Sequence, residues 1–366
     1  MKVLIVTSHL NFGGISSYSV SLARKLKEKG HDVFIASSGG DMVKELEGDK
    51  IKHIRVALNT KSELNPKIIL SSIKIALFLK SKKIDIMHAQ TRVAQVSCCL
   101  ASLFTQIPYI TTCHGFFKPK FTRKLFKFWG AKVIAISEAV RAHMVTDLKV
   151  SKSKIVMIHN GVDIANFKRN YNNSEKESIR KEFKVSNAPV VGIIARLSSV
   201  KGHTYLIEAA KLILNKKKDI QFLIIGDGPE EERLKKLAKT LKIEKNIIFH
   251  KSVLDTARPL AIMDIFVMPS ISEGLGLAIL EAMASGLAIV ASNVGGIYSL
   301  ISEGNNGYLV TPKNPEALDE AILKVIMNNK LSESMGQLSQ KICENNFSLS
   351  VFADQVENVY GQVLES

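Results

Sequence analysis

The chain has 366 residues, of which 46% are apolar. This length exceeds the size at which one hydrophobic core usually stops growing, so we expect two domains, and the apolar content excludes a disordered chain. The formal net charge is +16, and all of the excess lies in the first half: residues 1–168 contain 27 Lys and Arg against 11 Asp and Glu, whereas residues 169–366 contain 23 of each. Such one-sided charge favours a polyanionic partner, and scattered lysines on solvated faces are the alternative.

In the first half, short β-branched runs alternate with amphipathic stretches. Strands are predicted at Val3–Val6, His31–Ser37, Ile51–Ala57, Ile84–Ala89, Tyr109–Thr112, Lys132–Ile136 and Lys154–Ile158. Uncharged strands separated by helices imply a parallel sheet covered on both faces. The opening apolar run is too short for a secretion signal. Residues 93–117 lack charge but contain Gln95, Gln106 and Pro108, so they predict a helix followed by a strand and no transmembrane segment.

The alternation pauses at Ala165–Ala188, a stretch rich in asparagine and charge that predicts a connector. It then resumes with strands predicted at Val190–Ala195, Phe222–Ile225, Asn246–Phe249, Ile265–Met268, Ala288–Ala291 and Tyr308–Val310. A last amphipathic helix is predicted over Phe347–Leu364. The predicted fold class is therefore α/β, with two doubly wound Rossmann-like domains facing a central cleft at the carboxyl ends of their strands. We place the domains at residues 1–168 and 169–346, with a C-terminal helix in residues 347–366 that packs back on the first domain.

Cysteine and carboxylate spacings argue against a disulfide framework and against a metal site. The four cysteines, Cys98, Cys99, Cys113 and Cys343, show no C-x-x-C spacing. No D-x-D motif occurs, and Asp, His and Cys do not cluster. We therefore expect no metal ion, and a reducing cytoplasmic location fits the cysteines.

Aromatic and basic residues interleave over residues 116–129, from Phe116 to Trp129. This composition is typical of an interfacial segment on an anionic membrane surface, and ordinary helix packing with extended lysines is the alternative. We expect a peripheral position on the inner face of the cytoplasmic membrane through this segment. Nucleic acid is not expected as a partner, because the run belongs to no recognisable nucleic-acid-binding fold.

Two elements have the chemistry to hold phosphate. Gly13 and Gly14 separate the first strand from a helix, where free backbone amides attract an anion. They do not form the full G-x-G-x-x-G of dinucleotide-binding proteins, which counts against a nicotinamide cofactor. Arg196 and Lys201 follow the strand at Val190–Ala195, and two cations at the ligand-facing end of a strand can neutralise a diphosphate. A pair of solvated loop residues is the alternative.

The stretch SEGLGLAILEAMASG contains two glutamates eight positions apart, Glu273 and Glu281. Apolar residues surround Glu281 on nearly every face of a predicted helix, so its carboxylate needs a partner. Sugar hydroxyls are one candidate partner, and an ion pair within the core is the alternative.

Taken in order, several of these segments resemble the retaining glycosyltransferases of family four, which have the GT-B fold. The segments are Gly13-Gly14, Thr112–Gly115, Ala135–Ser137, Asn160–Asp163 with Phe167, Arg196 with Lys201-Gly202, Gly226–Pro229, Pro269-Ser270, the Glu273/Glu281 pair and Gly295-Gly296. The resemblance covers most of the chain. It implies an acceptor-binding first domain, a second domain that binds a nucleotide sugar, and no cofactor beyond that donor substrate.

By this resemblance, the carboxylate of Glu281 would hold the ribose hydroxyls of the donor. Glu273 and the backbone at Gly274, Leu275, Gly276 and Leu277 would hold its sugar. The diphosphate would be bound by Arg196 and Lys201, with help from the amides near Gly13 and Gly14. His114 would lie close to the reacting centre, and a packed histidine after a strand is the alternative for that residue.

Three positions depart from the family pattern. His250-Lys251 stand where a glycine is frequent, Leu287 replaces a common proline, and Ser299 replaces the usual glutamate of G-G-x-P-E. The last departure bears on the contacts near the diphosphate and on donor preference.

The resemblance implies transfer of a hexose from a nucleotide diphosphate sugar to an acceptor hydroxyl with retention of configuration. The acceptor would be a glycan or glycolipid of cell-surface polysaccharide or lipid-linked glycan synthesis, and a UDP-sugar donor is favoured by its frequency in the family. A nucleotide-sugar epimerase or a sugar phosphorylase of the same plan, and a non-catalytic basic membrane-binding module, are the alternatives.

Overall fold

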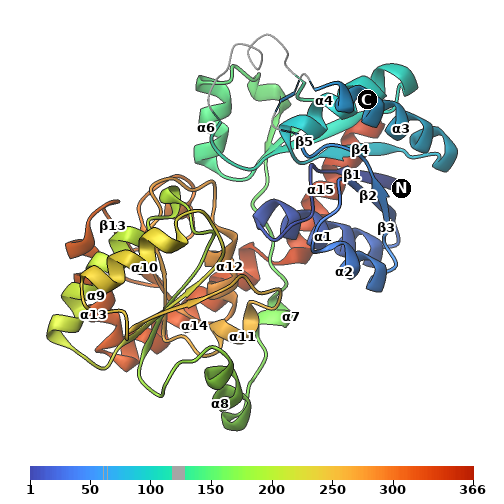
Figure 1. Cartoon of the computed structure of the whole chain (residues 1–366). Helices are drawn as coiled ribbons and strands as arrows, with labels where there is room; N and C mark the ends of the chain where they lie inside the picture. The colour runs from blue at the N-terminus through green and yellow to red at the C-terminus, as the bar shows by residue number, and fades with distance from the viewer. Residues whose placement is uncertain (61, 64, 118–127) are drawn as a thin grey trace. The chain divides into compact units, whose positions relative to one another are not determined.

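The computed structural model describes residues 1–60, 62–63, 65–117 and 128–366. The chain divides into two compact units, the first made of Met1–Gly161 with Leu349–Ser366 and the second of Val162–Ser348 (Figure 1). Each unit contains one parallel sheet with helices packed on it. The second unit is therefore one continuous segment, and the first unit is made of the two ends of the chain.

Within its described residues, the first unit has a seven-stranded sheet in the order β3-β2-β1-β4-β5-β6-β7. The strands are β1 (Lys2–Val6), β2 (Asp32–Ser37), β3 (Lys52–Arg55), β4 (Ile86–Ala89), β5 (Tyr109–Cys113), β6 (Val133–Ala135) and β7 (Ile155–Met157). The helices are α1 (Gly14–Glu28), α2 (Val43–Gly48), α3 (Pro66–Lys82), α4 (Arg92–Thr105), α6 (Glu138–Thr146), a 3₁₀ turn (Lys152–Lys154) and α15 (Leu349–Leu364). Figure 1 shows α1 and α15 on one face of this sheet and α3 and α4 on the other.

The second unit has six strands in the order β10-β9-β8-β11-β12-β13 across the part of it that is described. The strands are β8 (Val190–Ile194), β9 (Gln221–Ile225), β10 (Ile247–His250), β11 (Ile265–Met268), β12 (Ala288–Ser292) and β13 (Gly307–Val310). The helices are α7 (Ile164–Phe167), α8 (Asn173–Glu182), α9 (His203–Lys216), α10 (Glu231–Thr240), α11 (Ala257–Leu260), α12 (Leu277–Ala284), α13 (Pro315–Ile326) and α14 (Asn329–Asn346), with 3₁₀ turns η2 (Ser199–Lys201) and η3 (Ile297–Ser299).

In both sheets, almost every strand residue is buried or half-buried. Helices on both faces exclude water from a parallel sheet, which is why its strands are continuous apolar runs. The ends of all the predicted strands lie within two residues of the observed ones.

The segment predicted as a connector, Ala165–Ala188, contains a helix that the sequence analysis did not predict. Residues 173–182 form α8, which begins at a capping box: the side chain of Asn172 accepts from the Glu175 amide at 3.0 Å, and the Glu175 carboxylate accepts from the Asn172 amide at 2.7 Å. The side chain of Ile179 is buried beneath this helix. The asparagine-rich start that suggested a break is the cap of a helix.

The division between the units falls at residue 161, before the predicted boundary at residue 168. The amide of Val162 donates to the carbonyl of Phe347 at 2.9 Å, and α7 packs against α12. Because both contacts lie in the second unit, residues 162–168 belong to it. The second crossing, between Ser348 and Leu349, lies two residues beyond the predicted end of the second domain at residue 346.

Among the helices that the structure describes, none is long and apolar enough to cross a membrane.

Candidate functional site

The order of the second sheet reverses between β8 and β11, the strands that lie side by side at its centre. In doubly wound folds, ligands bind at the carboxyl ends of the strands beside such a switch point. Arg196 and Lys201 follow β8, Glu273 follows β11, and Glu281 lies on α12 immediately beyond. Four predicted site residues therefore gather at the ligand-facing end of one sheet.

Lys201 and Glu273 are 72 positions apart, and their side chains form an ion pair. The Ser270 hydroxyl also donates to the same Glu273 oxygen at 3.4 Å. The side chains of Lys201 and Glu273 are 24% and 12% exposed, so solvent screens this pair only in part. The lysine predicted to meet a diphosphate thus contacts the neighbouring carboxylate in this structure.

A close approach of two loops brings this pair together. The amide of Ile271 donates to the carbonyl of Val200 at 2.8 Å. Gly202 has a φ of 72°, and a Cβ there would lie 1.8 Å from the carbonyl oxygen of Pro269. Only glycine permits this backbone conformation at this distance, which places the end of η2 against the loop after β11.

Glu281 is half-buried, and its Oε2 accepts a hydrogen bond from the Thr256 hydroxyl at 3.0 Å. Burial raises the pKa of Glu281 to about 7, and the hydrogen bond from Thr256 opposes that rise. No ion pair involves this carboxylate in the described part of the chain. The core ion pair that the sequence left open for Glu281 is absent there, and a hydroxyl is its partner.

The glycine turn between the two glutamates starts α12. Gly276 has a φ of 98°, and the helix has no side-chain cap at its N-terminus. The first amides of α12 therefore lack an acceptor within the helix and suit the hydroxyls of a ligand. Leu275 is buried, and the Gly296 amide donates to the Glu273 carbonyl at 3.1 Å, so packing and a hydrogen bond both fix this turn.

Arg196 is exposed, and its guanidinium has no hydrogen-bond or ion-pair partner among the residues described. It lies two positions beyond the last residue of β8, at the same end of the sheet as Lys201. An unpaired guanidinium is available to an anion.

His114 and Gln90 meet in the first unit, each at the carboxyl end of a strand. His114 follows β5, Gln90 follows β4, and His114 Nε2 lies 2.8 Å from Gln90 Oε1. Burial lowers the pKa of His114 to about 3, so its imidazole is neutral at neutral pH. With the amide oriented as in the structure, His114 donates from Nε2 and keeps Nδ1 as an acceptor. Gln90 is 2% exposed, and its Nε2 has no partner among the described residues.

Tyr18, which contacts His114, is part of a chain of buried hydrogen bonds. The ring of Tyr18 packs edge-on against His114, with centroids 4.7 Å apart. The Tyr18 hydroxyl lies 3.1 Å from Thr112 Oγ1, which lies 2.7 Å from His88 Nε2, and His88 Nδ1 lies 2.7 Å from the hydroxyl of Tyr360. Burial lowers the pKa of His88 to about 3. The chain is therefore a set of neutral groups that positions His114.

Gly13 and Gly14 start α1. Gly13 has a φ of 152°, and nothing lies within 4 Å of where its Cβ would be. Backbone conformation, more than lack of space, explains glycine at this position. No side chain caps the helix, so its first amides lack an acceptor within it.

The predicted site residues thus form two groups, one in each unit. His114, Gly13 and Gly14 lie at the carboxyl end of the first sheet, and the others at that of the second.

Comparison with known proteins identifies the family. Residues 12–166 match the model "Glycosyltransferase Family 4", and residues 174–342 match "Glycosyl transferases group 1". The chain belongs to the family-four glycosyltransferases and has the GT-B fold.

Relatives and solved structures agree with this assignment. The glycosyltransferase is 27% identical to the capsular polysaccharide biosynthesis glycosyltransferase CapM of Staphylococcus aureus, over 93% of this chain and 92% of that protein. It is 28% identical to UDP-Gal:alpha-D-GlcNAc-diphosphoundecaprenol alpha-1,3-galactosyltransferase of Escherichia coli, over 79% of this chain and 78% of that one. The crystal structure of a glycosyltransferase from Rickettsia africae ESF-5 superimposes with a TM-score of 0.87 at 28% identity and covers 100% of this chain and 99% of that chain.

The sequence analysis did not predict Gln90, which contacts His114, or Thr256, which contacts Glu281, in this glycosyltransferase. Gln90 could have been predicted, because it directly follows the predicted strand Ile84–Ala89 and so lies at the ligand-facing end of the sheet. Thr256 could not, because it lies in the loop after β10 and only the tertiary fold brings it to Glu281.

The departures from the family pattern have local explanations in this glycosyltransferase. The ring of His250 packs on Phe183 with centroids 4.6 Å apart, and Leu287 is buried. The Ser299 hydroxyl donates to the Gly296 carbonyl at 2.7 Å, so it closes the turn η3 on itself.

Proposed function

We propose that this glycosyltransferase transfers a hexose from a UDP-sugar to an acceptor hydroxyl and retains the anomeric configuration. We assign it to the synthesis of cell-surface polysaccharide or lipid-linked glycan. Two relatives support the assignment: one is named for capsular polysaccharide biosynthesis, and the other for galactosyl transfer from UDP-Gal to a diphosphoundecaprenol-linked sugar.

The observation that carries the proposal is the group of charges beside β8 and β11. A half-buried carboxylate, an ion pair and an unpaired guanidinium lie at one switch point. In the proposal, Glu281 accepts hydrogen bonds from the ribose hydroxyls, while Arg196 and Lys201 bind the diphosphate. Glu273 and the backbone of Gly274–Leu277 bind the sugar. Lys201 then turns from Glu273 toward the phosphates, which leaves the Glu273 carboxylate free to accept from sugar hydroxyls.

In the reaction, the bond between the anomeric carbon and the diphosphate oxygen breaks. The acceptor oxygen bonds to the same face of that carbon, and its proton passes to the departing phosphate. The main catalytic task is to stabilise negative charge on the leaving diphosphate, and Arg196 and Lys201 perform it. These two cations neutralise the diphosphate directly, so the proposal includes no metal and no cofactor.

His114 has a positioning contact with the sugar in this scheme. Its neutral imidazole is a poor acid at neutral pH, because burial lowers its pKa to about 3. Its Nδ1 can accept a hydrogen bond that a sugar hydroxyl donates. We place the enzyme in the cytoplasm, peripheral to the inner face of the membrane. The segment predicted for that contact falls largely on residues 118–127, which lie outside the described residues, and Trp129 is buried.

The test begins with ligand-induced stabilisation. UDP is expected to raise the melting temperature more than GDP does, and a UDP-hexose to raise it further. Lys201→Met is expected to lower the transfer rate by about a hundred-fold, since removal of one charge-stabilising group has that typical effect. Lys235→Met is the matched control, because Lys235 forms an exposed ion pair with Glu231 on α10.

The anomeric configuration of the product, followed by NMR, tests retention. An inverted product overturns the proposed mechanism. Conversion of the donor sugar without an acceptor, to an epimer, identifies an epimerase. No thermal shift with any nucleoside diphosphate overturns the proposal as a whole.

A further inference from the structure

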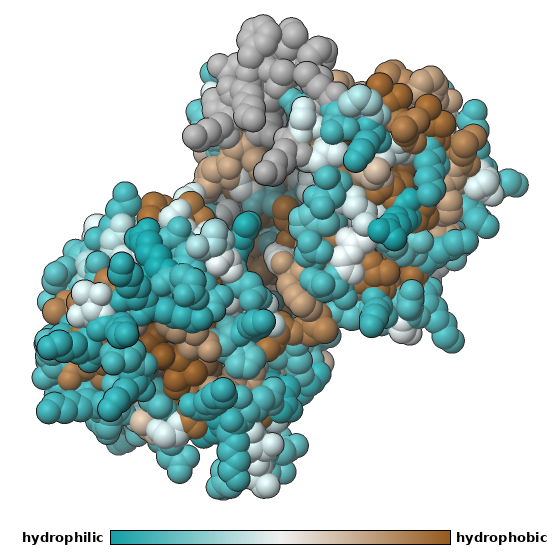
Figure 2. All heavy atoms as spheres, viewed as in Figure 1, coloured by the Kyte–Doolittle hydropathy of each residue, from teal (hydrophilic) through white to brown (hydrophobic). Residues whose placement is uncertain are grey.

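Large apolar side chains stand exposed on two neighbouring helices of the first unit. Figure 2 shows hydrophobic side chains gathered on the part of the surface where Figure 1 draws α3 and α4, which pack against each other. The exposed residues are Ile69, Leu70, Ile73 and Leu77 on α3, and Leu103 and Phe104 on α4. We call them the α3–α4 apolar face.

The core does not account for this face. Helix α3 has a separate buried stripe that includes Ile68, Ile75 and Leu79, and Ile75 and Leu79 belong to the core cluster with residues of the sheet. Leu70 and Leu77, about two turns apart, are 69% and 66% exposed on the opposite side. Contiguous exposed apolar residues with a polar rim mark an interaction surface.

The charge of the two helices restricts the partner. Helix α3 carries four lysines, and neither α3 nor α4 contains an aspartate or a glutamate. Lys67 and Lys74 are exposed and lie at one edge of the apolar residues on the surface of α3. Apolar side chains beside cations, without carboxylates, are typical of a helix that lies on an anionic membrane.

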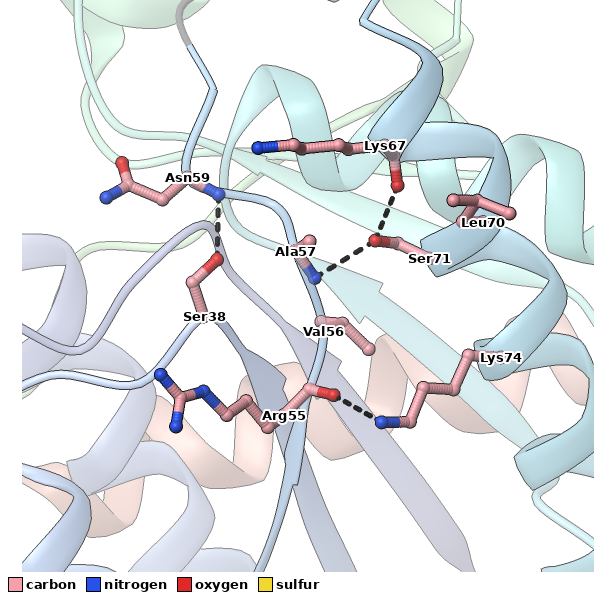
Figure 3. A pocket seen from close by; sticks show the side chains of 9 residues that line it. All are labelled: Ser38, Arg55, Val56, Ala57, Asn59, Lys67, Leu70, Ser71 and Lys74. Atoms are coloured by element: carbon pink, nitrogen blue, oxygen red, sulfur yellow. Dashed lines mark hydrogen bonds between the residues drawn. The ribbon is translucent and has the colours of Figure 1, made fainter.

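A pocket of about 470 Å³ opens beside this face (Figure 3). Its lining includes Arg55, Lys67, Leu70, Ser71 and Lys74. Leu70 belongs to both the pocket and the apolar face, so the two are continuous.

Hydrogen bonds fix the frame of the pocket. Lys74 Nζ donates to the carbonyl of Arg55 at 2.8 Å, and Ser71 Oγ accepts from the Ala57 amide at 3.1 Å. Figure 3 shows Lys67 at the upper edge of the pocket and Arg55 at its lower edge. Neither has an anionic partner among the described residues. Each of these two cations has the chemistry to bind a phosphate group.

We propose that the α3–α4 apolar face is the surface by which this protein docks on an anionic phospholipid bilayer. The apolar side chains enter the boundary between head groups and acyl chains, and the exposed cations Arg55 and Lys67 each contact lipid phosphates. A second copy of this chain fits the face less well. A symmetric contact would bring the lysines of both copies together with no carboxylate on either helix.

The inference concerns the membrane contact and does not depend on the proposed sugar transfer. It is also distinct from the contact expected through residues 116–129. Its test measures vesicle binding without any sugar donor, so its failure leaves the donor site untouched, and a failed transfer assay leaves the docking surface untouched.

The experiment is co-sedimentation of the full chain with vesicles of phosphatidylcholine, alone or mixed with phosphatidylglycerol. The protein is expected to bind the mixed vesicles and to be released by high salt. Leu70→Gln/Leu77→Gln is expected to lower the partition coefficient at least about ten-fold, because two leucines no longer enter the bilayer. Arg55→Gln/Lys67→Gln is expected to lower it by about ten-fold as well.

Matched controls come from the second unit. Leu254→Gln/Met327→Gln removes two exposed apolar side chains, and Lys236→Gln/Lys239→Gln removes two exposed lysines of α10. Both controls are expected to bind as the parent does. All of the exchanged side chains are exposed, so thermal unfolding should be unchanged and a loss of binding cannot come from misfolding.

Three outcomes overturn the proposal. The first is equal binding of the parent and the leucine variant, and the second is no preference for phosphatidylglycerol. The third is a parent dimer, detected by light scattering, that Leu70→Gln/Leu77→Gln converts to monomer while vesicle binding persists, because the face would then join two copies.

Discussion

At the scale of single residues, Glu281 combines an unfavourable environment with a proposed role. Burial raises the pKa of its carboxyl from 4.5 to about 7, and one hydroxyl, that of Thr256, is its hydrogen-bond partner. In the proposed complex, two ribose hydroxyls would donate further hydrogen bonds to this carboxylate. The free protein therefore bears a cost that donor binding would relieve, as is common where function requires a buried charge.

This cost predicts that Glu281→Gln raises the stability of the folded protein in a pH-dependent way. The folded protein holds a proton on Glu281 that the unfolded chain releases between pH 4.5 and about 7, so the residue lowers stability progressively as pH rises through that window. We expect Glu281→Gln to raise the free energy of unfolding by about 1–3 kcal/mol at pH 8 and by nothing at pH 4. Urea denaturation at both pH values measures it.

The control for this variant is Glu320→Gln, which changes an exposed glutamate of α13. An equal gain at pH 4 and pH 8 would contradict the titration argument. Binding of the donor is expected to move in the opposite direction, because glutamine has one acceptor oxygen and no charge where the carboxylate has two charged acceptor oxygens. UDP should stabilise the parent more than Glu281→Gln.

The sequence places the proposed site residues on their elements better than it predicts which side chains they contact. The apolar pattern around Glu281 indicates that its side chain is withdrawn from water, and the structure shows it half-buried. The pairing of Lys201 with Glu273 was not predicted, because it spans 72 positions and depends on which strands lie at the centre of the sheet. Strand order is a property of the whole fold, so it leaves no local signal.

At the scale of elements, glycines allow the loops of the second unit to pack against one another. A Cβ at Gly226 would lie 2.0 Å from the carbonyl oxygen of Ala195, and one at Gly202 would lie 1.8 Å from that of Pro269. These contacts hold the loops after β8, β9 and β11 at fixed separations. The positions of Arg196 and Lys201 depend on them.

Gly202→Ala is therefore expected to weaken both stability and the site. The new methyl group meets the Pro269 carbonyl at a backbone φ of 72°, so we expect a loss of at least about 2 kcal/mol. Donor binding should fall as well, because η2 and Lys201 shift with the loop. Urea denaturation and the thermal shift with UDP measure the two effects.

The matched control is Gly361→Ala on α15, where nothing lies within 4 Å of the added methyl group. It is expected to raise stability by about 0.5–1 kcal/mol, since alanine is the better helix former. If both alanine variants lose the same stability, the close approach at Gly202 has no special importance.

Elements were easier to predict than sites for a physical reason. A strand buried on both faces is a continuous apolar run, and the turn that follows it is rich in glycine, so both signals are local. Helix α8 was missed because its asparagine cap has the composition of a loop.

At the scale of the whole molecule, the chain crosses twice between the units, and its last helix completes the first one. Helix α15 packs on α1, where the rings of Phe352 and Tyr18 lie 4.9 Å apart. Gly161, the last residue before the first crossing, has no Cβ, and one there would lie 2.6 Å from that of Phe352. The first unit is thus assembled from both ends of the sequence.

Ion pairs and a buried hydrogen bond add to this packing. Lys29 pairs with Asp354 and Glu357 of α15, and Tyr360 bonds to His88 beneath the sheet. His88 is hydrogen-bonded to Thr112, and Thr112 to Tyr18, whose ring packs on His114. The last helix therefore supports the histidine that we place beside the donor sugar.

Truncation after Ser348 is therefore expected to loosen the first unit selectively. Loss of α15 removes the buried side chains of Phe352, Val356, Val359, Tyr360 and Val363 and leaves their partners open to water. Amides of β1, β4 and α1 should lose protection in hydrogen exchange, while those of β8 and β11 should keep theirs, because stability is distributed over local units. Removal of Glu365 and Ser366 alone, which lie beyond the helix, is the control and should change neither set. Equal loss of protection in both sheets would mean that the two units unfold as one, and no loss in the first would mean that α15 is dispensable for it.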